Sequence, residues 1–201
     1  IDINSDKATY EIQFGSVERP THKNTSWDAA RFEVCGHKYM DISDYGYGVS
    51  LLNDCKYGHN VDNGTMKLSL FKCATHPDPD ADKGEHIFTY SLFPHAGNYR
   101  EAGTVQLAYE INNPLEAFPI EKRDGTLPEE YSFVSCDKDN FIVETVKKAE
   151  RGNDIIVRGY ESYNKRTDVT LHFGFDINEA TVCDLLERDI KKLVIENNSV
   201  S

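Results

Sequence analysis

The stretch with the densest set of hydrogen-bonding side chains is GYGVSLLNDCKYGHN, residues 46–60. Its apolar first half is followed by Asn53, Asp54, Lys56 and Tyr57, at what the pattern predicts to be the end of a strand. Side chains of these types in a turn can hold the hydroxyl groups of a sugar, or a carboxylate. The spacing also allows a purely structural β-bulge turn in which Asp54 accepts hydrogen bonds from backbone N–H groups.

A second group of reactive side chains lies in the stretch CATHPDPDADKGEH. It contains three alternating aspartates, a glutamate and two histidines: Asp78, Asp80, Asp82, Glu85, His76 and His86. Alternating carboxylates are typical of calcium loops, but Lys83 stands where such a loop needs its glycine. The histidine spacing fits no standard zinc pattern. We therefore favour a solvated loop between two strands and predict no metal site in this chain.

The sequence carries no other motif that would assign a reaction. A nucleophile elbow, a P-loop and a dinucleotide fingerprint are all missing, and the position of Cys55 nominates no histidine as its base. Glycoside hydrolysis commonly needs two carboxylates, and 34 acidic residues allow many pairs to be drawn. Spacing alone cannot choose among these pairs.

Charge and composition limit the partners. The 201 residues include 34 acidic and 22 basic side chains, which gives a net charge of −12 and makes nucleic acid and membrane surfaces poor partners. No apolar run approaches the roughly 18 to 20 residues that cross a bilayer. Five dispersed cysteines without a C-x-x-C pair indicate reduced thiols and a cytoplasmic protein.

Hydrophobic periodicity predicts the fold that must position these groups. Apolar residues alternate around 66–70, 141–145, 155–159 and 169–175, and turn signals such as Asp62-Asn63-Gly64 separate the alternating segments. We expect a mainly β protein, an antiparallel β-sandwich with at most one short helix or crossover. Residues 1–201 are expected to form a single domain.

Three segments depart from the strand pattern. Residues 100–117, REAGTVQLAYEINNPLEA, favour a short helix that Pro114 would end. Residues 121–139 are polar and are expected to form a loop. Residues 193–200 look like a terminal hairpin turning at Asn197-Asn198, and its truncated appearance suggests a piece of a longer polypeptide.

Several stretches together resemble one family. They are ATYEIQFGSVERPTHKNTSWDAARFEVCGHKYMDIS, GYGVSLLNDCKYGHN, HPDPDADKGEHIFTYSLFPHAG, REAGTVQLAYEINNPL and VKKAERGNDIIVRGYE. In this order they resemble the C-terminal β-rich region of glycoside hydrolase family 38 α-mannosidases of the cytosolic and bacterial type. The resemblance covers most of residues 8–196 and implies a super-sandwich fold similar to that of galactose mutarotase.

The resemblance implies an intact enzyme that removes terminal α-linked mannose with retention of configuration. It implies an aspartate nucleophile, a carboxylic general acid and a zinc ion, all in an N-terminal catalytic domain outside this chain. No catalytic residue and no metal ligand is therefore expected here, and the isolated chain should be inactive. The expected partners are that catalytic domain, an α-mannoside and, in the parent protein, further copies in a homo-oligomer.

The resemblance also gives the 53–58 turn a role. Golgi-type relatives carry an arginine-containing turn, Asp-Asp-Asn-Arg-Gly, that is similar to Asn53 through Gly58 and lies at the rim of the sugar pocket. Asn53, Asp54, Lys56 and Tyr57 are therefore our candidate rim residues, with Lys56 in place of the arginine. A lysine is a point charge without the planar fork of arginine, so bidentate contacts would be lost.

Two other functions remain open from the sequence. A free carbohydrate-binding module could use exposed aromatic rings, with Trp27, Tyr57 and Tyr99 as candidates. A structural or assembly domain would instead use such rings to fill the seam with a neighbouring domain, which the resemblance favours for Trp27. Binding of mannosides by this chain alone would separate the first function from the second.

Overall fold

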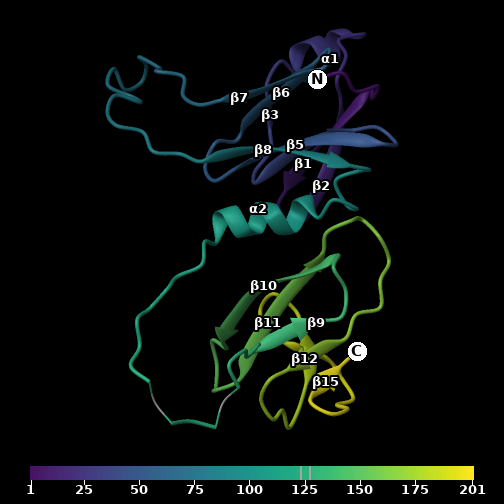
Figure 1. The fold of residues 1–201 in the computed structure, drawn as a ribbon, viewed down its shortest axis with the longest axis vertical. Coiled ribbons are helices and arrows are strands. Elements are labelled where there is room, and N and C mark those ends of the chain that lie inside the picture. Colours follow the sequence, from purple (N-terminus) through teal and green to yellow (C-terminus); the bar gives the residue numbers. More distant parts are fainter. Residues whose placement is uncertain (123, 127) are drawn as a thin grey trace. The chain divides into compact units, whose positions relative to one another are not determined.

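Antiparallel strands dominate the computed structural model, which describes residues 1–122, 124–126 and 128–201 (Figure 1). The expected mainly β, antiparallel class is confirmed. The limit of one helix is wrong, because two short helices form within these residues. Neither of them is long and apolar enough to cross a membrane.

The chain divides into two compact units, Ile1–Ala117 and Phe118–Ser201. The division falls just before the segment 121–139 that we expected to be a loop. Each unit is described by itself below. The expectation that residues 1–201 form one sandwich domain stays a prediction.

Unit 1 contains eight strands and the two helices among its described residues. Their bounds are β1 (Lys7–Ile12), β2 (Gly15–Pro20), α1 (Ser26–Ala30), β3 (Val34–Cys35), β4 (Tyr39–Ser43), β5 (Tyr47–Asn53), β6 (Gly58–Asp62), β7 (Thr65–Ser69), β8 (Tyr90–Ala96) and α2 (Thr104–Asn112). The strands form a five-stranded sheet in the order β2-β1-β4-β5-β8 and a three-stranded sheet in the order β3-β6-β7.

The hydrophobic core of unit 1 lies between these two sheets. Tyr10 on β1, Met40 on β4 and Leu51 on β5 are at most 6% exposed, and they form one cluster with Val61 on β6. Met66 and Leu68 of β7 pack against it, as their predicted alternation requires. Two sheets joined by one apolar layer make unit 1 a small β-sandwich.

The other face of the five-stranded sheet is covered by α2 (Figure 1). Side chains alternate along a strand, so Tyr39 and Asp41 point away from the core that Met40 and Ile42 line. The helix buries Thr104, Val105 and Ala108 against this face. The helix predicted within residues 100–117 is thereby confirmed, and it ends at Asn112, two residues before Pro114.

The helix that the sequence analysis missed, α1, is a single capped turn. Thr25 accepts a hydrogen bond from the Asp28 backbone N–H, and the Asp28 carboxylate accepts one from the Thr25 backbone N–H. This reciprocal capping box uses aspartate at the position that more often holds glutamate. None of the residues of α1 is buried, so the sequence contains no amphipathic pattern that would predict this helix.

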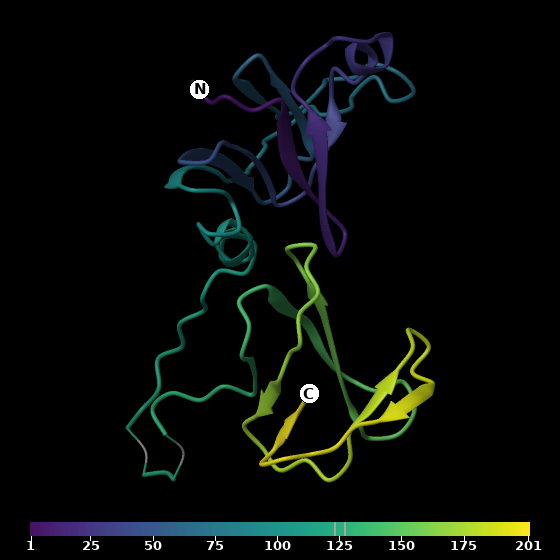
Figure 2. The ribbon, with the colours of Figure 1, turned by 90° about the vertical axis from the view of Figure 1, so that its right-hand side faces the viewer.

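Unit 2 contains seven strands in three small sheets among its described residues (Figure 2). Their bounds are β9 (Val134–Cys136), β10 (Phe141–Lys148), β11 (Ile155–Glu161), β12 (Leu171–Phe173), β13 (Thr181–Cys183), β14 (Asp189–Lys192) and β15 (Ser199–Val200). The pairs β10–β11 and β13–β14 form hairpins, and β15-β12-β9 form a three-stranded sheet. The predicted strands around 141–145 and 155–159 are confirmed as β10 and β11.

Three expectations for unit 2 need correction. The strand expected over 169–175 is shorter and covers only Leu171–Phe173, β12. The expected loop 121–139 contains strand β9, which pairs with β12. Residues 123 and 127 of that loop lie outside the described residues. The Asn197-Asn198 turn forms with positive φ at both residues, but its second strand, β15, pairs with β12. Residues 193–195 form no strand, so the terminal hairpin is reduced to a single bridge between Glu196 and Ser199.

The core of unit 1 contains a histidine whose titration should be visible in stability. His59 lies on the same face of β6 as Val61, is fully buried, and burial lowers its pKa to about 4. Between pH 6.5 and about 4 the unfolded chain binds a proton that the folded chain does not. As the pH is lowered from 6.5 to about 4, the free energy of unfolding should therefore decrease, and His59 should account for roughly 1.4 kcal/mol per pH unit of this decrease.

Urea unfolding of the chain at several pH values, followed by circular dichroism, checks this slope. A His59→Gln variant keeps every other titrating group and should show a shallower dependence between pH 6.5 and 4. Equal slopes for the two proteins would contradict the prediction.

Candidate functional site

The turn that joins β5 to β6, residues 53–58, is built around Asn53. This residue is fully buried; its Nδ2 donates to the His37 carbonyl over 2.7 Å, and its Oδ1 accepts from the Lys56 N–H over 2.7 Å. Its backbone N–H donates to the Lys38 carbonyl over 2.9 Å. A single side chain thus fixes the turn to the start of β4 and sets the path of the chain through Lys56.

Asp54 anchors the same turn to the segment before β8. Its Oδ2 accepts from the Thr89 N–H over 2.9 Å, and its own N–H donates to the Thr89 carbonyl over 3.2 Å. Burial tends to raise the pKa of Asp54, but hydrogen bonds from Cys55 and Thr89 outweigh it and hold the pKa below its usual value. The purely structural interpretation of this turn required Asp54 to accept a hydrogen bond from a backbone N–H group, and the contact with Thr89 is such a bond.

Lys56 and Tyr57 each contact an aromatic ring. The Lys56 Nζ lies 5.1 Å from the centre of the Phe88 ring, a cation–π distance. Tyr57 is 49% exposed and meets the His37 ring edge-on, with 5.1 Å between ring centroids. The four predicted residues therefore divide into two anchors, the buried Asn53 and the half-buried Asp54, and two residues that do not anchor the turn, the half-buried Lys56 and the exposed Tyr57. Their role at a pocket rim stays a prediction.

The C-terminal end of α2 also contacts this turn. Asn112 Nδ2 donates to the Asn53 carbonyl over 3.0 Å. One turn earlier, the Tyr109 ring lies 4.5 Å from Lys38 Nζ, which also pairs with the buried carboxylate of Glu11 over 2.8 Å. Burial opposes the charge on Lys38, but the Glu11 carboxylate outweighs burial and raises the pKa of Lys38.

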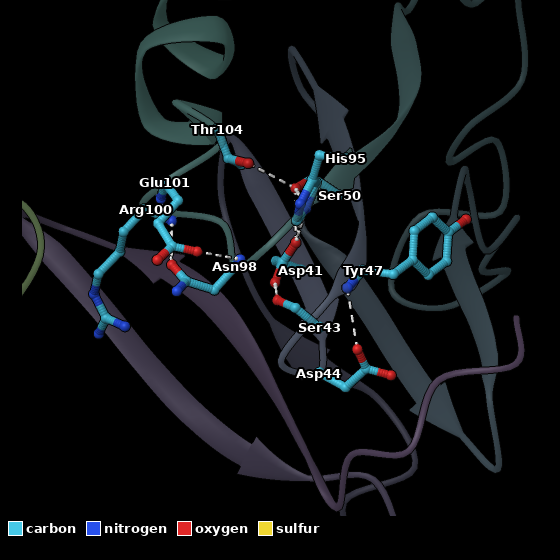
Figure 3. A network of polar contacts seen from close by, with 10 residues as sticks. All are labelled: Asp41, Ser43, Asp44, Tyr47, Ser50, His95, Asn98, Arg100, Glu101 and Thr104. Carbon is cyan, nitrogen blue, oxygen red and sulfur yellow. Dashed lines mark hydrogen bonds and ion pairs between the residues drawn. The ribbon is translucent and has the colours of Figure 1, made fainter.

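A second polar cluster lies under the N-terminal end of α2 (Figure 3). The Asp41 carboxylate is 1% exposed; its Oδ2 lies 2.8 Å from His95 Nε2 and accepts from Ser50 Oγ over 2.8 Å. Ser43 donates to the other carboxylate oxygen. Thr104 Oγ1, on α2, lies 2.8 Å from Ser50 Oγ. Strands β4, β5 and β8 and the helix each contribute a group, so the cluster joins all four.

Serine, histidine and aspartate are the residue types of a hydrolytic triad, but this cluster is not one. A triad histidine contacts the serine through one ring nitrogen and the aspartate through the other. Here both Asp41 and Ser50 meet Nε2 of His95, at 2.8 and 3.2 Å. Ser50 is fully buried, so no substrate reaches its hydroxyl. The arrangement fits a structural role.

Sequence reasoning missed this cluster because its members are far apart in the chain: Ser50 and His95 are separated by 45 residues. One signal was available. Asp41 and Ser43 stand in a segment, YMDIS, whose apolar residues already mark it as a buried strand. A carboxylate at such a position requires partners, and this requirement predicts a buried polar contact.

The carboxylates of the acidic loop contact its own backbone and a lysine. Asp82 accepts from the backbone N–H groups of Lys72 and Cys73, and Asp80 pairs with Lys83. Among the residues that the structure describes, no group of three histidine, cysteine, aspartate or glutamate side chains is placed to hold a metal ion. His86 stacks on Phe71 with 5.4 Å between ring centroids.

Two family models match the chain. Residues 1–80 match the glycosyl hydrolases family 38 C-terminal domain, and residues 140–201 match the family 38 C-terminal beta sandwich domain. The chain is 46% identical over 189 residues to Alpha-mannosidase 2C1 of Homo sapiens, which covers 92% of this chain and 18% of that protein. It is also 46% identical over 167 residues to Alpha-mannosidase G of Dictyostelium discoideum, and this match covers 82% of this chain and 15% of that protein.

A solved structure shows the same fold. The alpha-mannosidase from Enterococcus faecalis V583 matches with a TM-score of 0.79 and 20% identity, over 98% of this chain and 23% of that one. The β-rich fold of this chain is thus shared with part of that structure. The chain belongs to the C-terminal region of glycosyl hydrolase family 38. It spans less than a fifth of the length of the human relative.

The buried anchor of the turn can be tested directly. Asn53→Ala removes the acceptor of the Lys56 N–H and the donor to the His37 carbonyl, so the free energy of unfolding should fall by roughly 2 kcal/mol. Amide hydrogen exchange at Lys56 should become faster, because the Lys56 N–H no longer has the Asn53 side chain as its acceptor. Lys56→Ala, which keeps both contacts, is the matched control and should leave stability nearly unchanged; unaltered exchange at Lys56 in the Asn53 variant would refute the assigned role.

Proposed function

We propose that this chain is the C-terminal accessory region of an α-mannosidase that hydrolyses terminal α-linked mannose. The observation that carries the proposal is the 46% identity over 189 residues to Alpha-mannosidase 2C1, supported by 37% identity over 206 residues to the Saccharomyces cerevisiae Alpha-mannosidase. Matches to both a mammalian and a yeast α-mannosidase favour the same activity for the intact parent of this chain.

In this proposal the reaction takes place outside the chain. The nucleophile, the general acid and the zinc ion implied for the family would belong to the N-terminal catalytic domain of the same polypeptide. The buried serine–histidine–aspartate cluster has no access to substrate, and the described residues bring no three metal-binding side chains together. We accordingly assign no step of the retaining reaction to residues of this chain.

The apolar surface of unit 2 supports a contact with the remainder of the polypeptide. Among its described apolar residues only Val200 is buried, whereas many others are at least 42% exposed, and these include Val146, Ile155, Val182, Leu185, Leu186, Ile190 and Val194. Five of these lie on or beside the β13–β14 hairpin. An exposed surface of this kind marks an interface, and the missing four fifths of the polypeptide is its expected occupant.

Within the intact enzyme the 53–58 turn would border the sugar pocket. Asn53 and Asp54 hold the turn by hydrogen bonds to the His37 carbonyl and the Thr89 N–H, and Asn112 holds it at the Asn53 carbonyl, so Lys56 and Tyr57 lie on a turn fixed from three sides. Lys56 would hold a mannose hydroxyl or a neighbouring carboxylate by a charge-assisted hydrogen bond.

Five unpaired cysteines support a reducing compartment, and we place the enzyme in the cytoplasm.

A stand-alone carbohydrate-binding module is the second candidate. Trp27, at 77% exposure on α1, offers a ring face on which a sugar could stack, whereas Tyr99 is buried at 3% and offers none. Titration of the isolated chain with mannosides distinguishes the candidates. Saturable binding that a Trp27→Ala change abolishes would favour the module.

The proposed rim contact predicts a kinetic effect in the full-length enzyme. Lys56→Ala should lower kcat/KM for a chromogenic α-mannoside by about tenfold or more, because one charge-assisted hydrogen bond to the substrate is lost. Lys83→Ala removes the same charge from the exposed acidic loop and should leave kcat/KM unchanged. Turnover by the Lys56 variant equal to that of the wild type would eliminate the rim role.

A further inference from the structure

Unit 1 contains a small open cavity that none of the functions above uses. It is partly open to solvent and lies between β2, α1 and β6. Its lining includes four basic side chains, Arg19, His22, Lys23 and Arg31, but only one acidic side chain, Asp28. In a chain with a net charge of −12 this local excess of positive charge is unexpected.

The acidic groups near the cavity are already engaged. Asp28 closes the capping box of α1 and lies 3.6 Å from His22. Asp62 pairs with Lys23 over 2.5 Å. Neither Arg19 nor Arg31 forms an ion pair with any carboxylate in the described parts of the chain, 1–122, 124–126 and 128–201.

Arg19 is the most constrained of these cations. Its guanidinium lies over the Tyr10 ring, 4.8 Å from the ring centre, and its Nη1 is buried without a hydrogen-bond partner among the described residues. Burial lowers the pKa of Arg19, the nearby Tyr10 and Cys35 partly oppose this, and repulsion from Arg31 lowers it further. Two arginines thus repel each other across the cavity, and its one lining carboxylate, Asp28, interacts with Arg31 while it remains engaged with Thr25 and His22.

We propose that this cavity binds a small oxyanion such as inorganic phosphate. Guanidinium groups hold phosphate and carboxylate oxygens with paired, charge-assisted hydrogen bonds. A tetrahedral anion has enough acceptors to satisfy the buried Nη1 of Arg19 and the exposed guanidinium of Arg31 together. The bound anion would connect β2 to the C-terminal end of α1, a helix that buries none of its own residues, and it would stabilise this corner of unit 1.

Calorimetric titration of the full-length protein with sodium phosphate, against sodium chloride of equal ionic strength, tests the proposal. We expect saturable phosphate binding and a rise in melting temperature that chloride does not reproduce. Arg31→Gln should weaken binding by about tenfold, the loss of one charge-assisted contact. Arg31 is exposed at the end of α1, so this variant should fold; Arg19→Gln should weaken binding at least as much.

Arg151→Gln is the matched control, because Arg151 is an exposed arginine in the turn between β10 and β11 of unit 2. It removes the same charge from the protein and should leave phosphate affinity unchanged. Two results would overturn the proposal. One is the absence of saturable binding in the full-length protein, as expected if a carboxylate from another part of the polypeptide fills the cavity. The other is equal weakening by the Arg31 and Arg151 variants, which would indicate a general charge effect.

Discussion

The carboxylate of Asp41 is buried beneath α2, and much of unit 1 is arranged to satisfy it. A carboxylate without partners in an apolar interior carries a large desolvation cost, so its neighbours must supply hydrogen bonds. They do so from four elements: Ser43 on β4, Ser50 on β5, His95 on β8 and, through Ser50, Thr104 on α2. The contact between Thr104 and Ser50 ties the helix to this cluster. The directional contacts therefore give α2 a fixed placement that apolar packing alone would leave less specific.

The position of α2 in turn determines the position of the turn at residues 53–58. Its N-terminal residue, Thr104, contacts the Asp41 cluster, and its C-terminal residue, Asn112, reaches the Asn53 carbonyl. Asn53 then holds the Lys56 N–H and the His37 carbonyl. A sequence of short contacts thus runs from a buried carboxylate to a presented lysine. Functional loops on rigid scaffolds are commonly held in this way, since a mobile lysine would lose more entropy on binding a sugar.

Local patterns predicted the parts of the fold that local physics determines. The alternation in β7, β10 and β11, the Asn63-Gly64 turn with positive φ at both residues, and the helix over Thr104–Asn112 all depend on neighbouring residues. The sequence did not predict α1, whose helix depends on capping and not on burial. Nor did it predict that β15 pairs with β12, because that pairing is decided by tertiary contacts.

The candidate site shows the same division. The side-chain types of the 53–58 turn identified it as a cluster of hydrogen-bonding groups, but spacing could not show that Asn53 and Asp54 are anchors while Lys56 and Tyr57 are presented. That distinction depends on Thr89 and Asn112, which are 35 and 59 residues away from their partners in the turn. The resemblance to family 38 supplied the functional context, which the geometry of this C-terminal region does not contain.

The central claim is that this chain supports and borders a catalytic centre located elsewhere in the polypeptide. The most direct measurement compares hydrolysis of a chromogenic α-mannoside, with zinc present, by the 201-residue chain and by the full-length protein at equal molar concentration. Hydrolysis by the full-length protein alone is the expected result. Hydrolysis by the 201-residue chain would mean that its own carboxylates carry out the reaction, and it would contradict the accessory role.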